Sequence, residues 1–313
     1  MTKHHIAKLG VLTTAILAIP AISFAGTASK DFKPVVEKCK ESCITGDLGI
    51  NVVSQYISRG VIFENQSAIL EPYADLYFRL YQGEGFINKI SLNLGIWNSF
   101  HSRHTDAGLV SGGNPSTPAW YEFDFTAGLA ITFAKNFTFT PSYYFFLSPN
   151  DGFPNFQALN LNLAYDDTDL LGKFALHPHV TVMFELENTA AGTGKDEGVY
   201  YEVGIAPAAP VGPVTLTFPI TAGFGSGDFY GSLNPNTGNI DNEGFGFFTA
   251  GVTASYALKF VPECYGAWTA TAGYAYYYLG DGTADFNTAP RGGAVRDFSH
   301  NEHVFSGGLS VAF

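Results

Sequence analysis

The sequence has few charged residues and lacks long apolar runs beyond its start. Only 14% of its 313 residues are Asp, Glu, Lys or Arg, whereas 15% are aromatic. Disordered chains show the reverse, because they combine high charge with few aromatic side chains. After residue 25, no apolar run reaches the roughly 18 residues that a membrane-spanning helix needs. The composition therefore excludes a disordered chain and a helical membrane protein.

Basic residues are especially scarce, and this excludes one class of partner. The chain has 16 Lys and Arg residues against 28 Asp and Glu residues. Lys3 and Lys8 fall in the first 25 residues, which contain no acid, so the remainder has a net charge of 14 − 28 = −14. Nucleic-acid binding needs a basic surface that neutralises phosphates. We therefore expect no nucleic-acid partner.

The first 25 residues are typical of a secretion signal. Basic residues precede the apolar stretch Leu9–Ile19, and Ser23-Phe24-Ala25 forms a small-x-small cleavage site. The apolar stretch is shorter than the roughly 20 residues of a spanning helix. We predict that residues 1–25 are a signal peptide, that 26–46 are a periplasmic lead-in segment, and that 47–313 form the folded domain.

From Leu48 onward the apolar residues alternate with polar ones, which is typical of strands with one apolar and one wet face. Most of these segments reach the 9 to 11 residues or so that a membrane-spanning strand needs. Twelve strands are predicted, at Leu48–Ser58, Leu70–Tyr81, Lys89–Ile96, Tyr121–Phe133, Phe137–Leu147, Phe156–Tyr165, Phe174–Leu186, Val199–Ala206, Val214–Phe224, Phe245–Leu258, Ala267–Leu279 and Asn301–Phe313.

The connections alternate in length. Long polar connections such as His101–Pro118 and Gly280–His300 follow odd-numbered strands, and short ones such as Ala134–Asn136 and Pro207–Pro213 follow even-numbered strands. Bacterial outer-membrane barrels sort their loops in this way, with short turns in the periplasm. The pattern predicts an all-β fold: a closed, antiparallel, up-and-down transmembrane barrel of about twelve strands in the outer membrane.

Aromatic residues gather near the ends of the predicted strands, where we expect two interfacial girdles. At the long-loop end lie Trp120, Tyr121, Tyr143, Tyr144, Tyr200, Tyr201, Phe247, Tyr276 and Tyr277, and at the short-turn end lie Phe133, Phe137, Tyr165, Phe174, Tyr256 and Trp268. The alternative interpretation is that these rings belong to an ordinary core.

The chain has three cysteines, and an exported protein enters an oxidising compartment. The predicted topology places Cys39, Cys43 and Cys264 on the periplasmic side. We therefore predict a disulfide from Cys264 to either Cys39 or Cys43, with the third thiol free or paired between chains. The Cys39-x-x-x-Cys43 spacing has no neighbouring ligand, so it predicts no metal site.

The last strand, Val304–Phe313, places Phe305, Leu309, Val311 and Phe313 on one face. It resembles the C-terminal assembly signal of bacterial outer-membrane proteins, and this resemblance implies that the barrel-assembly machinery reads Phe313. The segment Ser54–Gly60 is similar to the first-strand motif of the TorF-like putative porins. In that interpretation Arg59 is either a residue of the barrel rim or a selectivity residue.

A barrel of twelve strands has a narrow lumen, because eight strands leave almost no space and 16 to 18 leave a wide channel. We expect side chains of the wall to fill this lumen in part, and residues 26–46 are a second candidate for filling it. The wet faces carry seven acids and two permanent cations, which favours cations or neutral solutes over anions. The predicted pore-lining residues are Glu71, Asp75, Arg79, Lys89, Glu122, Asp124, His177, His179, Glu185, Glu187 and Glu202.

These features predict a porin-like channel for the passive diffusion of small hydrophilic solutes, with no cofactor and no catalytic residues. A metal site is not predicted, because His177 and His179 lie about 20 Å from Glu185 and Glu187 along an extended strand, so the four side chains cannot bind one ion. Two alternatives remain. The first is a barrel enzyme of the lipase or protease type, for which His101–His104 and His300–His303 are candidates. The second is a non-conducting structural or adhesion barrel.

Overall fold

The computed structural model describes residues 42–102, 119–150, 153–188, 197–226, 229–233, 240–288 and 299–313. Side chains of residues 232, 233, 240–242 and 285–288 are not described. The predicted signal peptide, Cys39 and most of the predicted lead-in segment lie outside these ranges.

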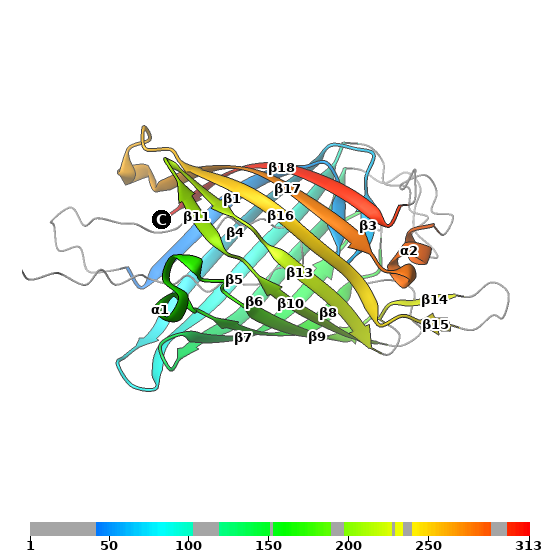
Figure 1. The fold of residues 1–313 in the computed structure, drawn as a ribbon, viewed down its shortest axis with the longest axis horizontal. Coiled ribbons are helices and arrows are strands. Elements are labelled where there is room, and N and C mark those ends of the chain that lie inside the picture. The colour runs from blue at the N-terminus through cyan, green and yellow to red at the C-terminus, as the bar shows by residue number, and fades with distance from the viewer. Residues whose placement is uncertain are drawn as a thin grey trace, which may run out of the picture.

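The chain forms one closed antiparallel barrel (Figure 1). Neighbours along the chain pair with each other, and β18 pairs with both β17 and β1, which joins the first strand to the last. The barrel segments are β1 (Ile44–Val53), β4 (Ile69–Gln82), β5 (Ile87–His101), β6 (Trp120–Phe133), β7 (Phe137–Leu147), β8 (Phe156–Tyr165), β9 (His179–Glu187), β10 (Val199–Ile205), β11 (Ala208–Val211), β12 (Val214–Thr217), β13 (Ile220–Ser226), β16 (Phe245–Ala257), β17 (Ala267–Leu279) and β18 (Asn301–Ala312).

These fourteen segments make twelve barrel strands, because two strands are interrupted. Pro207 separates β10 from β11, and Pro219 separates β12 from β13, which both pair with β16. Proline has no N–H to donate to a ladder, so it interrupts the hydrogen bonding, although the strand register is the same on both sides of each proline. The prediction of a twelve-stranded, up-and-down antiparallel barrel is confirmed. The predicted turn at Pro207–Pro213 is corrected to Gly212 and Pro213, between the paired residues Val211 and Val214.

Several other boundaries differ from the prediction, including the end of β1 at Val53 and the extent of β5 from Ile87 to His101. β1 begins at Ile44, inside the predicted lead-in segment, and Gly46 exchanges two backbone hydrogen bonds with Phe313, at 3.0 and 2.9 Å. β9 begins at His179 rather than Phe174, because a turn of α-helix, α1 (Thr168–Leu171), and a 3-10 turn, η2 (Gly172–Phe174), precede it.

Several short elements lie at the barrel ends. The short-turn end also carries η3 (Glu263–Tyr265). The other end carries α2 (Asp281–Thr288) and the small hairpin of β14 (Gly231–Leu233) and β15 (Ile240–Asn242), as Figure 1 shows. Among the described residues, no helix has the length and apolar character needed to cross a membrane.

The two faces of the barrel wall differ in polarity. The outer face of β1 exposes Leu48, Ile50 and Val52, whereas Asn51 and Val53 are buried inside. The same alternation runs around the barrel, with exposed apolar side chains that include Leu70, Leu76, Ile96, Phe125, Leu129, Leu163, Val180, Phe184, Val203, Phe305 and Leu309. The inner face carries buried Ser, Thr, Asn and acidic residues.

The predicted aromatic girdle at the long-loop end is confirmed for four of its nine residues and wrong for the other five. Trp120, Tyr143 and Tyr201 are 42%, 37% and 39% exposed on the outer face, and Tyr276 is partly exposed there. Five other rings point inward and are at most 3% exposed, namely Tyr121, Tyr144, Tyr200, Phe247 and Tyr277. Adjacent aromatic residues on a strand point to opposite faces, so each doublet contributes one ring to each side. The aromatic side chains therefore form both an outer belt and an inner lining.

Candidate functional site

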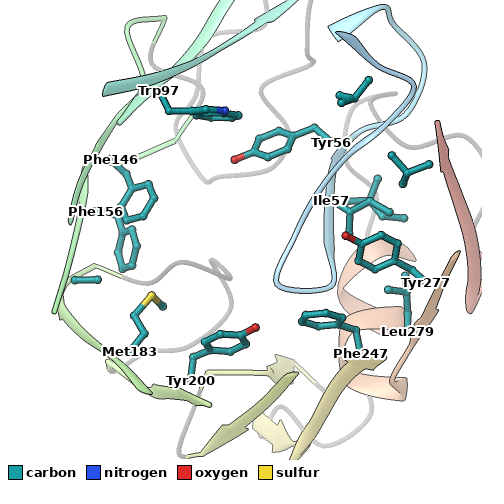
Figure 2. Packing of buried hydrophobic residues seen from close by; sticks show 14 of the residues in the cluster. Tyr56, Ile57, Trp97, Phe146, Phe156, Met183, Tyr200, Phe247, Tyr277 and Leu279 are labelled. Carbon is teal, nitrogen blue, oxygen red and sulfur yellow. The ribbon is translucent and has the colours of Figure 1, made fainter. Parts of the chain in front are cut away.

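A short hairpin occupies the inside of the barrel. It comprises β2 (Tyr56–Ser58) and β3 (Val61–Glu64), which lie in the connection from β1 to β4. Ser58 pairs with Val61, so only Arg59 and Gly60 form the turn. Their φ angles of 50° and 84° are left-handed, as a type I′ turn requires. Ile57 and Ile62 are fully buried, and Figure 2 shows Ile57 within the ring of inward-pointing wall residues.

Tyr56 attaches the start of the hairpin to the wall. Its hydroxyl donates a 2.7 Å hydrogen bond to Glu122 Oε2. Its ring lies 5.4 Å from that of Trp97 and 5.2 Å from that of Phe63. Burial, followed by the negative charge of Glu122, raises the pKa of Tyr56 well above its ordinary value. The phenol therefore stays a neutral donor.

Glu64 attaches the other end of the hairpin. Ser99 Oγ and His101 Nε2 lie 3.0 Å apart, and His101 Nδ1 lies 3.8 Å from Glu64 Oε2. Glu64 Oε1 also accepts the backbone N–H of Ser67 at 3.0 Å. The His101 ring stacks on Tyr121 with centroids 4.6 Å apart. These contacts connect the base of the hairpin to β5 and β6.

Ser99, His101 and Glu64 contact one another in the order in which a serine nucleophile, its base and an orienting acid do in hydrolases. However, Ser99 is fully buried, and His101 and Glu64 are each 1% exposed. Of the sequence candidates for an enzyme, Arg103 and His104 lie outside the described residues. His300 contacts the Leu279 carbonyl, and His303 contacts the Tyr274 hydroxyl on the outer face. The described histidines therefore do not converge on one site.

The tip of the hairpin reaches the opposite wall. The Arg59 guanidinium lies 5.4 Å from the Phe146 ring centroid and 6.0 Å from that of Tyr200. The Arg59 carbonyl accepts a 2.8 Å hydrogen bond from the Tyr230 hydroxyl. A Cβ on Gly60 would lie 3.0 Å from Thr283 in α2. The hairpin thus extends across the lumen from β5 and β6 toward β16.

Buried carboxylates surround the hairpin. Glu71 is 0% exposed, and Glu122, Asp124, Glu185 and Glu202 are 5 to 6% exposed on the inner face. Among the described residues, Arg59 is the single buried Lys or Arg. It attracts Glu122, Asp124 and Glu202 electrostatically. The centre of the lumen therefore carries an acidic wall around one central cation.

Some of these acids have additional partners. Tyr200 donates a 2.6 Å hydrogen bond to Glu202 Oε2, and His179 Nε2 lies 3.8 Å from Glu202 Oε1. Glu185 Oε2 accepts the Gly198 N–H at 2.6 Å. These contacts hold the acids of β9 and β10 in fixed positions.

Other predicted pore-lining residues lie elsewhere. Asp75, Arg79 and Lys89 lie on the inner-face register toward the short-turn end, where Arg79 donates to Gln82 at 2.9 Å and Lys89 is exposed. Two positions require correction. Glu187 accepts a hydrogen bond from Gln157, which lies on the outer face of β8, because a bulge shifts the register there. His177, with a left-handed φ of 49°, lies in the turn before β9.

His177 belongs to a small polar cluster at the short-turn end. Its Nδ1 lies 3.6 Å from Asp166 Oδ1 and 3.9 Å from Asp167 Oδ1. Asp167 already accepts the N–H groups of Leu176 and His177, at 2.9 to 3.0 Å. Burial raises the pKa of Asp167, but these hydrogen bonds outweigh it, so the pKa lies below its ordinary value. The cluster fixes the turn into β9.

Cys43 and Cys264 carry free, exposed thiols. The structure therefore does not form the predicted Cys43–Cys264 disulfide. Cys39, the other predicted partner of Cys264, lies outside the described residues.

The inward hairpin and the central position of Arg59 were not predicted from the sequence. The available signal was an Arg-Gly pair between two short apolar segments, which favours a two-residue hairpin turn because glycine adopts a positive φ. The segment Ser54–Gly60, compared above with the first strand of TorF-like porins, lies beyond the end of β1.

No family model matches the chain, and no curated protein matches it significantly. Solved structures resemble its fold. The NanC porin matches 84% of this chain and 98% of its own, at 11% identity and a TM-score of 0.44. An outer membrane channel from Pseudomonas putida F1 matches 86% and 95%, at 11% identity and a TM-score of 0.46. The outer membrane phospholipase A from Escherichia coli matches 85% and 89%, at 14% identity and a TM-score of 0.39. Similarity at this level carries no functional argument.

Proposed function

We propose that this protein is an outer-membrane, porin-like channel through which small hydrophilic solutes diffuse passively. The observation that carries the proposal is a closed barrel with an apolar outer face and a polar, acidic inner face. Backbone groups in lipid must be paired within the protein, and a closed barrel satisfies this condition. Outer-membrane lipid is thus the partner of the outer face.

The predicted export signal and the terminal strand fit the same location. The outer face of β18 exposes Phe305 and Leu309, and Phe313 is 55% exposed. We propose that the barrel-assembly machinery reads this strand and that the short turns face the periplasm.

The hairpin makes the channel narrow. A barrel of twelve strands encloses a lumen between the filled eight-stranded type and the wide porin type. Here the segment from Tyr56 to Glu64 extends across that lumen. Solutes therefore pass between the hairpin and the wall, which limits their size.

The wall carboxylates set the charge preference. The buried inner wall carries five acids against one buried cation, Arg59. The acids are Glu71, Glu122, Asp124, Glu185 and Glu202. Negative side chains in a confined pore lower the energy of cations and raise that of anions. We propose a mild preference for cations and neutral solutes.

Planar-bilayer recordings on the refolded full chain test this function. We expect single-channel currents with a reversal potential displaced toward cation selectivity in a KCl gradient. Replacing residues 56–64 with a short Gly-Ser linker should increase the conductance. Removing β14 and β15, which lie outside the barrel (Figure 1), should leave it unchanged and serves as the matched control.

The alternatives predict different results. A correctly folded barrel with no conductance, with or without the hairpin, would support a structural or adhesion role. Lipid hydrolysis that is lost on Ser99→Ala would support an enzyme. Clear anion selectivity would contradict the charge argument and leave the channel itself in place.

A further inference from the structure

Buried polar atoms without a partner occur at several places in the described lumen, and four of the side chains that carry them lie on the adjacent strands β1, β4, β5 and β6. Asn51 Nδ2 and Trp97 Nε1 are donors without an acceptor, and both oxygens of Glu71 and Oδ1 of Asp124 are acceptors without a donor. Their residues are all at most 9% exposed. Buried polar groups in proteins nearly always have a partner, so such a group calls for a ligand or ordered water.

These residues form one patch. Asn51 on β1 lies directly opposite Glu71 on β4, and Trp97 on β5 lies directly opposite Asp124 on β6. Glu71 is two residues from Tyr73, whose cross-strand partner is Trp97, so the two pairs are diagonal neighbours. The four strands are adjacent, and the patch is about 15 Å wide at about 4.8 Å per strand.

Each pair places an unpartnered donor beside an unpartnered acceptor. A hydroxyl group both donates and accepts, so it can satisfy one of each. An ammonium group only donates and would leave Asn51 and Trp97 unmatched. An anion only accepts, and the surrounding carboxylates repel it. The chemistry of the patch therefore matches a neutral solute with several hydroxyl groups.

The aromatic residues next to the patch add an apolar surface. The rings of Trp97 and Tyr56 lie 5.4 Å apart at 45°, and Figure 2 shows both pointing into the lumen. Ligand sites commonly combine aromatic walls with a few placed polar groups. A sugar ring offers C–H groups to the aromatic surface and hydroxyls to the polar atoms.

We propose that Asn51, Glu71, Trp97 and Asp124 form a binding site for neutral sugars or polyols inside the lumen. This inference rests on the channel function proposed above and specifies its substrate class. The four residues lie on the inner face of β1, β4, β5 and β6, where the Trp97 ring contacts the hairpin residue Tyr56.

Current block by added solutes tests the site. We expect glucose or sucrose to reduce the KCl current of the full-length channel in a saturable manner, more strongly than putrescine or gluconate. Trp97→Phe keeps an aromatic ring, although a smaller one, and removes the N–H donor, so it should raise the half-blocking sugar concentration about fivefold, the effect of one lost hydrogen bond. Glu71→Gln keeps an acceptor and should retain most of the block. Asn162→Ala, on β8, is the matched control and should not change the block, because the Asn162 amide already donates to Thr181 Oγ1 at 2.9 Å.

The outcomes separate the two proposals. Current without sugar block, or equal block in the Trp97→Phe channel, would overturn the sugar site and leave the channel function intact. Stronger block by putrescine that Glu71→Gln abolishes would overturn it in favour of a cation site. If the folded protein carries no current, calorimetric binding of sucrose to the detergent-solubilised barrel decides. A heat of sucrose binding that is present in the wild type and lost in Trp97→Phe supports the site. The absence of any heat of binding in the wild type overturns it.

Discussion

The Tyr56 hydroxyl donates a 2.7 Å hydrogen bond to Glu122 Oε2, which joins the inward hairpin to the barrel wall. Tyr56→Phe removes this bond and retains the ring contacts with Trp97 and Phe63. A hydrogen bond to a charged group contributes about 1.5–3 kcal/mol. We expect a less firmly held hairpin, measured as larger and more frequent conductance fluctuations in single-channel recordings.

The matched control is Tyr143→Phe. The Tyr143 hydroxyl donates to Gln157 at 2.6 Å on the outer face of the barrel. Its loss should not alter the current. If both variants fluctuate equally, the hairpin is not held by Tyr56.

Arg59 is the one buried permanent cation of the described lumen. A unit charge about 8 Å from a permeating ion, at an effective dielectric constant of about 40, contributes ~1 kcal/mol. Arg59→Gln should lower the energy of a cation and raise that of an anion by this amount each, so the cation-to-anion permeability ratio measured from reversal potentials should increase about 25-fold. Arg79→Gln, at the short-turn end, should change this ratio less. An equal effect of the two substitutions would mean that Arg59 does not face the ion path.

The strand framework could be predicted from the sequence because the barrel wall imposes a strict period of two. Each strand separates an apolar outer face from a polar inner face, so the alternation and the loop lengths identify the twelve strands. The errors arise where local features override this period. Pro207 interrupts one strand without turning the chain, and the left-handed His177 delays the start of β9.

The centre of the site was much harder to predict. Residues 54–58 follow β1 with no glycine or proline to mark a turn, and tertiary packing places them in the lumen, where Ile57 is fully buried. The aromatic doublets were also ambiguous, because a sequence does not state which ring of a pair faces lipid. The pairing of β5 with β6 shifts register between Ser99 and Phe100. Near this shift, at the start of β6, the Tyr121 ring points into the barrel.

Gly60 is expected to be essential for the hairpin turn. Its φ is 84°, and a Cβ there would lie 3.0 Å from Thr283 Cγ2. Gly60→Ala should destabilise the hairpin by about 1–2 kcal/mol through the left-handed backbone alone, and further through this contact. We expect more frequent conductance fluctuations in single-channel recordings. Gly212→Ala is the control, because φ is 62° there but no atom lies within 4 Å of the added Cβ. Equal fluctuations in both variants would show that Gly60 is not required to hold the hairpin turn.

Asp167 should make the turn before β9 sensitive to acid. Its carboxylate accepts N–H groups of Leu176 and His177, and its pKa lies below the ordinary value of 3.8. A depressed pKa contributes stability that is complete above the ordinary pKa and is lost as the pH falls through the folded pKa. Asp167→Asn should therefore lower the free energy of unfolding by about 1–2 kcal/mol near neutral pH, and by less at strongly acidic pH. Urea unfolding followed by heat-modifiable gel mobility at both pH values measures this difference.

Asp169→Asn, at an exposed neighbouring position, is the control and should show no such decrease of the difference at acidic pH. A constant difference between the wild type and Asp167→Asn across the acidic range would mean that the charge of Asp167 does not stabilise the turn.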